Sequence, residues 1–157
     1  MAIEVVNRQR LAPIDANRIA RVAGATLAAV GKPGAGVTVA FVRDRAIRVL
    51  NRRFREIDRP TDVLSFPASA GSEDGADGGF VSAQTPEYLG DVVVSTDTAL
   101  RQANEAGHAF GREVDELVMH GVVHLCGYDH ETDHGEMNRL ELRLRRKLLD
   151  RDLTHEG

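Results

Sequence analysis

His120-Gly-Val-Val-His124-Leu-Cys-Gly127-Tyr-Asp-His130 is the most informative segment of this chain, because it spaces three histidines by four and six residues. A helix turns by about 100° per residue, so the first two rings lie about 40° apart on one helical face. Gly127 can end this helix in a left-handed conformation and turn the chain back toward the same side. Imidazole is the commonest metal ligand, and three protein ligands leave a fourth zinc position open, as in catalytic sites. The segment therefore predicts a metal-site helix ending in a glycine turn, with His120, His124 and His130 binding one Zn²⁺ per chain.

The spacing resembles the long zinc signature of the metzincin proteases, H-E-x-x-H-x-x-G-x-x-H. The glutamate that acts as general base in those proteases would fall at position 121, where this chain has Gly121. Glycine cannot accept a proton, so the pattern indicates the metal scaffold of a hydrolase without the base of a protease. Cys126 could be a fourth ligand, but it lies about 200° round the helix from His124, which favours a small core residue.

Away from this segment, apolar periodicity predicts short strands and amphipathic helices. Strands are expected at 3–6, 37–42, 63–66 and 92–94, and helices are expected to begin near residues 15, 44, 96, 111 and 133. Asp44 is the expected N-cap of the second helix, and Ser95 or Thr96 that of the third. Helices dominate the end of the chain, a pattern that predicts an α+β domain with one small mixed four-stranded sheet covered by helices. Residues 68–87, rich in Gly, Ser, Ala and Asp, predict an exposed mobile loop.

The composition limits the class of protein. A chain of 157 residues fits one domain, expected over 1–157, and can bury a core. No apolar run approaches the ~20 residues of a membrane span, and the first residues lack the pattern of a signal peptide. Cys126 is the only cysteine, which excludes an intrachain disulfide and favours a reducing compartment. These features predict a cytoplasmic protein with no membrane partner.

Basic and acidic residues are unevenly distributed along the chain. The net charge is −4, yet Arg43–Arg59 holds seven arginines against three acidic residues, and Arg139–Arg151 holds six basic residues against two acidic ones. Two basic patches on an acidic body could hold a phosphate backbone. They could equally be solvated helix faces with i,i+4 ion pairs.

Three segments carry a resemblance to a known family: Leu50-Asn-Arg-Arg-Phe-Arg-Glu-Ile-Asp-Arg-Pro-Thr-Asp-Val-Leu-Ser-Phe-Pro67, Leu89-Gly-Asp-Val-Val-Val-Ser95 and His120–His130. In order and spacing they resemble the YbeY family of bacterial endoribonucleases, the rRNA maturation factors, from about residue 40 to the end. The resemblance implies a zinc-dependent, single-strand-specific endoribonuclease that acts in 16S rRNA 3′-end maturation and in quality control of the small ribosomal subunit. It implies as partners the 16S rRNA precursor and the small subunit with its associated proteins, and no DNA.

The resemblance also implies roles for individual residues. The family's zinc ligands fall on His120, His124 and His130, and the arginine needed for activity falls on Arg55. Arg55 can hold phosphate oxygens in a bidentate fork and stays protonated. Asp129 is a candidate for a general base or for a residue that orients a metal ligand, and it is otherwise a residue that stabilises the turn. The matching segments also contain further polar residues whose roles the resemblance leaves open, namely Thr61, Asp62, Ser65 and Asp91.

Other interpretations remain open. The zinc spacing suggests a metalloprotease-like hydrolase, against which Gly121 argues. A non-enzymatic ribosome assembly factor would use the metal only to hold its C-terminal helices, and would unfold on chelation rather than lose activity. The histidines outside the triad, His108, His134 and His155, are expected at the surface.

Overall fold

The computed structural model describes residues 2–68, 87–129 and 133–150 of the chain. Its sheet has the strand order β1-β2-β4-β3, with β1 at Ile3–Asn7, β2 at Gly36–Val42, β3 at Val63–Pro67 and β4 at Tyr88–Ser95. The pairs β1–β2 and β2–β4 are parallel, whereas β3 runs antiparallel to β4 and forms one edge. The predicted mixed four-stranded sheet is confirmed. The predicted loop over 68–87 falls almost entirely outside the described residues.

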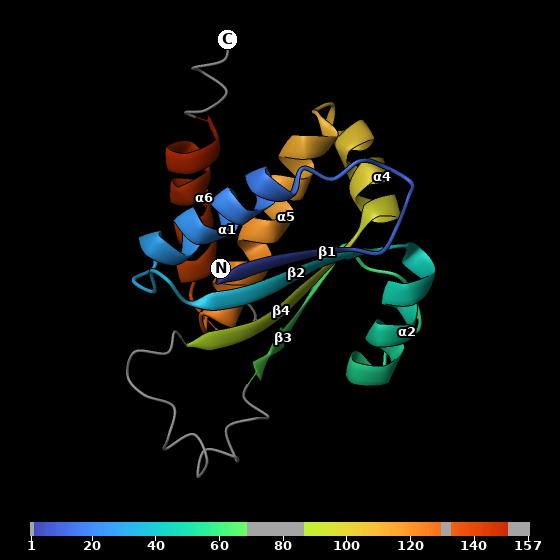
Figure 1. Ribbon diagram of the computed structural model, residues 1–157, viewed down its shortest axis with the longest axis horizontal. Coiled ribbons are helices and arrows are strands. Elements are labelled where there is room, and N and C mark those ends of the chain that lie inside the picture. Colours follow the sequence, from blue (N-terminus) through green and yellow to red (C-terminus); the bar gives the residue numbers. More distant parts are fainter. Residues whose placement is uncertain (1, 69–86, 130–132, 151–157) are drawn as a thin grey trace.

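The helices cover both faces of this sheet (Figure 1). They are α1 (Ala16–Ala29), α2 (Asp44–Arg55), α4 (Thr96–Ala106), α5 (Phe110–Leu125) and α6 (Glu136–Leu144), which continues as the π-helical turn η2 (Arg145–Asp150). The last helix begins three residues later than expected, because the Asp133 carboxylate accepts from the backbone N–H groups of Gly135 and Met137 and Gly135 adopts φ +98°. No helix among the described residues is long and apolar enough to cross a membrane.

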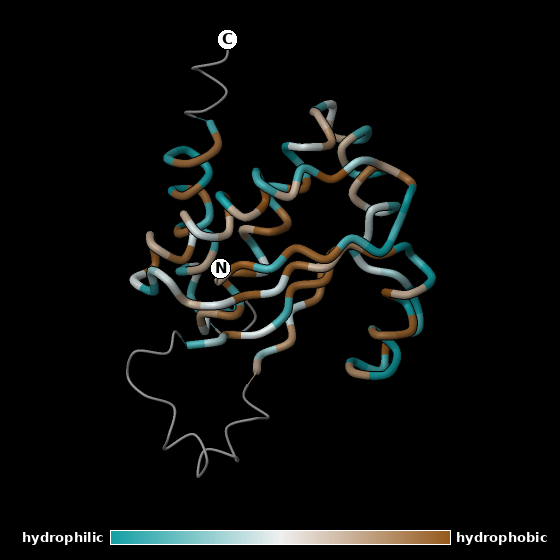
Figure 2. Tube along the Cα trace, viewed as in Figure 1, coloured by the Kyte–Doolittle hydropathy of each residue, from teal (hydrophilic) through white to brown (hydrophobic). Residues whose placement is uncertain are grey.

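The larger core lies between the sheet and the helices α1, α5 and α6, and a smaller one lies under α2. Figure 2 shows apolar segments along the strands, with polar residues on the outer sides of the helices. Helix α5 is the most deeply buried helix, since Val118, Val122 and Val123 are fully enclosed. The smaller core consists of Ile47, Leu64 and Val93. Together these contacts place the ends of α2 and α5 on opposite sides of the edge strand β3.

Helix α5 lies close to the sheet at Gly121. A Cβ at this position would come within 2.5 Å of Val92 Cγ1 on β4. Beside it, the Ser65 hydroxyl on β3 donates a hydrogen bond of 3.0 Å to the Gly121 carbonyl. The absence of a side chain at 121 therefore sets the distance between α5 and the two strands.

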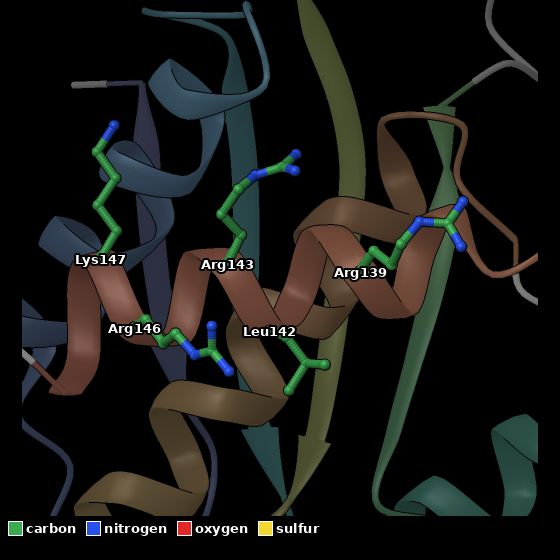
Figure 3. A pocket seen from close by; sticks show the side chains of 5 residues that line it. All are labelled: Arg139, Leu142, Arg143, Arg146 and Lys147. Carbon is green, nitrogen blue, oxygen red and sulfur yellow. The ribbon is translucent and has the colours of Figure 1, made fainter.

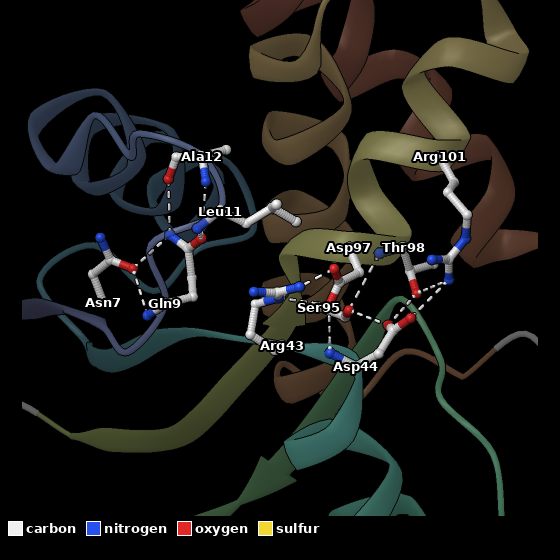
Figure 4. Close-up of polar contacts among 10 residues, drawn as sticks. All are labelled: Asn7, Gln9, Leu11, Ala12, Arg43, Asp44, Ser95, Asp97, Thr98 and Arg101. Atoms are coloured by element: carbon white, nitrogen blue, oxygen red, sulfur yellow. Dashed lines mark hydrogen bonds and ion pairs between the residues drawn. The ribbon is translucent and has the colours of Figure 1, made fainter.

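A polar network fixes the start of α2 (Figure 4). Asp44 is the first residue of α2 rather than its N-cap, which is Arg43. Its carboxylate accepts hydrogen bonds from Ser95 Oγ (2.5 Å), Thr98 Oγ1 (2.7 Å) and Arg101 Nη2 (2.9 Å). Burial alone would raise the pKa of Asp44, but these donors outweigh it and the net shift is downward. Ser95 also caps α4, as predicted, so the network joins the two helices.

Asp44→Asn is expected to lower the free energy of unfolding by about 1–2 kcal/mol at neutral pH, because the charge-assisted hydrogen bonds are removed. A depressed folded-state pKa contributes stability above the unfolded value, near pH 4, and loses it as the pH falls through the folded value. The difference between wild type and variant should therefore be constant from pH 7 to 5 and shrink below about pH 4. Urea unfolding at several pH values measures it. A difference that is independent of pH would contradict the ionic nature of this network.

Candidate active site

A cleft of about 600 Å³ runs along the edge strand β3, between the C-terminal ends of α2 and α5. Its lining residues come from three parts of the chain: Phe54, Arg55, Thr61, Asp62, Val63, Leu64, Ser65, Phe66, Pro67, His120, His124 and Asp129. Segments that are separate in the sequence therefore share one concave surface.

His120 and His124 form one wall of the cleft. They are one turn apart on α5, with ring centroids 5.8 Å apart and ring planes at 79°. Gly127, at φ +101°, ends the helix in the left-handed conformation predicted for it. His130 lies outside the described residues. Within the described ranges no group of three His, Cys, Asp or Glu side chains is placed to hold a metal ion, so the three-histidine zinc site stays a prediction.

Glu141 on α6 holds the first of these rings. Its carboxylate lies 3.0 Å from His120 Nδ1, and the residue is only 4% exposed. The hydrogen bond to Glu141 raises the pKa of His120 despite burial, which acts in the opposite direction. With Nδ1 engaged, Nε2 is the nitrogen through which His120 can bind a metal. Histidines that bind a metal commonly donate their other ring N–H to a carboxylate, so the pair of His120 and Glu141 fits a metal site.

The sequence carries a signal for Glu141 that the histidine spacing does not include. Glu141 lies on the inner side of an amphipathic helix, beside the buried Met137, Leu140 and Leu144. A carboxylate at such a position requires a partner, because a buried charge without one is costly. Besides His120, Arg145 pairs with this carboxylate, with its Nη2 3.5 Å from Glu141 Oε1.

Glu141→Gln is expected to weaken zinc binding by about 10-fold or more, the lower part of the range for residues that support metal ligands. The amide keeps the shape of the side chain but removes the negative charge that orients His120. Competition with a chromophoric chelator measures the affinity. Glu116→Gln is the matched control, because Glu116 also pairs with Arg145, at 3.9 Å, while its closest ion pair is with Arg112, at 2.6 Å. Equal weakening in both variants would assign the effect to Arg145.

Arg55 approaches the same cleft from the opposite side of β3. It is the last residue of α2, which ends because Glu56 adopts a left-handed conformation at φ 60°. In the described part of the chain Arg55 forms no ion pair, so its guanidinium is available to an anion. The structure thus places Arg55 and the two histidines around one cavity, which their separation in the sequence does not by itself predict.

The other polar residues of the matching segments divide into two groups. Thr61, Asp62 and Ser65 line the cleft, where Asp62 Oδ1 accepts from the Val63 N–H at 2.7 Å. Asp91 lies on β4 outside the lining and accepts a hydrogen bond from the Tyr88 hydroxyl.

The other histidines, Cys126 and Asp129 differ in their surroundings. His108 is partly exposed at the surface, and its ring pairs with Glu113 at 2.6 Å. His134 is exposed, as predicted, and His155 lies outside the described residues. Cys126 packs against the main core, and burial raises the pKa of its thiol, in agreement with its interpretation as a small core residue. Asp129 lines the cleft.

The two basic segments differ in structure. In the first, Arg43 pairs with Asp97 and Arg48 with Asp58, so part of the charge is neutralised. In the second, a basic face on the outer side of α6 and η2 surrounds a hollow of about 590 Å³ (Figure 3). This basic face consists of Arg139, Leu142, Arg143, Arg146 and Lys147. None of its four cations forms an ion pair within the described ranges.

Comparison with known proteins assigns a class to this arrangement. Proteins similar to the chain are named endoribonucleases, which are hydrolases that act on RNA. The family model described as Endoribonuclease YbeY matches residues 4–149. The chain belongs to this family.

Individual relatives agree with this assignment. An endoribonuclease YbeY of Geobacter metallireducens is 39% identical over 146 residues, covering 92% of each chain. One of Chloroflexus aurantiacus is 44% identical over 131 residues, covering 82% of each. The solution structure of TM1509 from Thermotoga maritima superposes with a TM-score of 0.60 at 24% identity, covering 98% of this chain and 93% of that one. This last likeness supports the fold alone.

Proposed function

We propose that this protein is a zinc-dependent, single-strand-specific endoribonuclease that acts in 16S rRNA 3′-end maturation and in quality control of the small ribosomal subunit. The observation that carries the proposal is the single cleft that joins Arg55 to His120 and His124, in a chain whose relatives are endoribonucleases. Such a substrate implies a cytoplasmic protein that acts on precursor 16S rRNA and the small subunit.

Phosphodiester cleavage places negative charge on the phosphate oxygens in the transition state. Arg55 holds two of those oxygens through its planar guanidinium fork. His120, His124 and His130 hold the metal, with the ring of His120 oriented by Glu141. When bound, Zn²⁺ supplies Lewis acidity toward a phosphate oxygen and acidifies water. Asp129, which lines the cleft, is the carboxylate proposed to accept the proton that the attacking RNA 2′-hydroxyl or water loses.

Gly121 argues against a peptidase. A protease of the related zinc signature needs a glutamate at this position, but Gly121 faces β4 and not the cleft, with Val92 and Ser65 Oγ within 3.3 Å of a Cβ placed there. The position therefore serves the packing of α5 on the sheet and has no room for a general base.

The test is cleavage of a single-stranded RNA that spans the 3′ end of 16S rRNA by purified wild-type protein. We expect cleavage that EDTA removes and that added Zn²⁺ restores. The DNA of the same sequence and the fully paired RNA duplex serve as controls and should stay intact. Cleavage that persists in EDTA, or no cleavage even of RNA within small subunits, would contradict the proposal.

The basic face of α6 and η2 is expected to contribute to RNA binding by neutralising phosphates. Arg143→Glu combined with Arg146→Glu should weaken RNA binding and reduce the slope of log affinity against log salt by about 1 for each phosphate that the protein no longer neutralises. Fluorescence anisotropy at several salt concentrations measures both. Arg8→Glu combined with Arg10→Glu, which changes two exposed arginines outside this face, is the charge-matched control. Equal weakening in both pairs would show a general effect of net charge.

A further inference from the structure

Phe54 is the most exposed large apolar side chain among residues 2–68, 87–129 and 133–150, with 59% of its surface accessible. It lies in the last turn of α2 and lines the cleft beside Arg55. A largely exposed aromatic ring at the rim of a cavity leaves apolar surface in water, on which a flat ligand can stack.

The ring of Phe54 is held in place by two neighbours. Phe66 on β3 meets it edge to face, with ring centroids 5.3 Å apart and planes at 70°. Phe66 itself packs against the smaller core of Ile47, Leu64 and Val93. The guanidinium carbon of Arg53 lies 5.6 Å from the centroid of the Phe54 ring. The ring is therefore supported by the sheet and bordered by positive charge, yet remains mostly uncovered.

We propose that Phe54 is the stacking platform for one unpaired nucleobase of the RNA, next to the phosphate held by Arg55. This inference rests on the proposed function and adds a base subsite to it. Aromatic rings flanked by arginines bind single-stranded nucleic acid by stacking, because every base offers a flat π-face and the arginines contact the backbone. A base within a duplex has both faces covered, so this subsite selects single strands.

The surroundings of Phe54 favour a base over a protein or a membrane. The other exposed large apolar residue of α2, Val49 (48% exposed), does not line the cleft, so Phe54 meets the cleft without it. Arg52, Arg53 and Arg55 share the last turn with Phe54. A single ring among arginines matches the alternation of flat bases and phosphates along an RNA strand.

The experiment is single-turnover cleavage by the zinc-loaded enzyme, with protein in excess over a short single-stranded RNA. Phe54→Leu keeps an apolar side chain but removes the π-face, and it should raise the half-saturating protein concentration by roughly 5- to 150-fold. The effect should fall mainly on this concentration rather than on the saturated rate. Phe54→Trp should retain tight binding, and Val49→Ala, which shortens the other exposed large apolar side chain of α2, should match wild type.

A set of RNAs with one abasic nucleotide at successive positions identifies the stacked base. In wild type one position should give the same weakening as Phe54→Leu, and in the Phe54→Leu variant that position should give no further weakening. Unchanged half-saturation in Phe54→Leu, or abasic penalties of equal size in both proteins, would overturn the stacking subsite. Absence of cleavage by wild type would instead refute the proposed nuclease function, and direct binding of the same RNAs would then decide the subsite separately.

Discussion

Replacement of His124 by alanine is expected to abolish RNA cleavage and to remove most of the bound zinc while the domain stays folded. His124 lines the cleft beside His120, and removal of one of three proposed ligands should cost more than the roughly 10- to 100-fold that removal of a supporting residue costs. Cleavage of the 16S-derived RNA, the zinc content per chain and the circular dichroism spectrum measure the three quantities. Equal cleavage by wild type and His124→Ala would indicate a contaminating nuclease or a metal-independent site.

Arg55→Ala is the companion variant that separates metal binding from phosphate binding. Arg55 comes from α2, on the far side of β3 from the histidines, so its removal should leave zinc content unchanged. Removal of one preorganised donor to the developing charge should lower the cleavage rate by about 100- to 1,000-fold. Full activity in Arg55→Ala would remove this arginine from the mechanism, and a parallel drop in zinc content would show that the two walls of the cleft are not independent.

Gly121→Ala is expected to destabilise the fold, although alanine normally favours helices over glycine by about 1 kcal/mol. The added Cβ would lie 2.5 Å from Val92 Cγ1, and Val92 is fully buried. Overpacking of this kind costs about 1–3 kcal/mol or more, so the steric cost exceeds the gain in propensity. Urea unfolding should therefore show a lower midpoint for this variant.

Gly24→Ala provides the matched control for this prediction. Gly24 lies within α1, and a Cβ there would meet no atom within 4 Å. The substitution should raise the free energy of unfolding by up to about 1 kcal/mol. If Gly121→Ala were as stable as Gly24→Ala, the close approach of α5 to β4 would not be what excludes a side chain, and the structural argument against a peptidase would fail.

Local pattern was sufficient for much of the fold. Apolar periodicity predicted the strands and helices, and the glycine at 127 predicted the end of α5, because these features depend on neighbouring residues. The strand expected at 92–94 extends over Tyr88–Ser95, since pairing with β2 and β3 recruits residues such as Gly90 that have low intrinsic strand preference. Asp44, the expected cap of its own helix, bonds instead to α4.

The candidate site was predictable only in part, because sequence patterns report local structure and not how distant elements pack together. The histidine spacing on α5 is local, whereas the placement of Arg55 and Phe54 opposite it depends on how α2 docks on the sheet. The contact between Glu141 and His120 depends on how α6 packs beside α5, and the apolar periodicity of either helix does not predict that packing. The family resemblance supplied Arg55, but neither Glu141 nor Phe54.

The parallel pairing of the sheet also determines when the cleft can exist. Val39 on β2 pairs with Val5 on β1 and with Val92 on β4, so strands far apart in the sequence must meet before the sheet is complete. Pairings across such separations form slowly, and synthesis delivers the N-terminal segments first. Helix α5, which begins at Phe110, follows all four strands. A growing chain therefore carries Arg55 well before it carries His120 and His124, and the cleft between them cannot be complete until α5 has been synthesised.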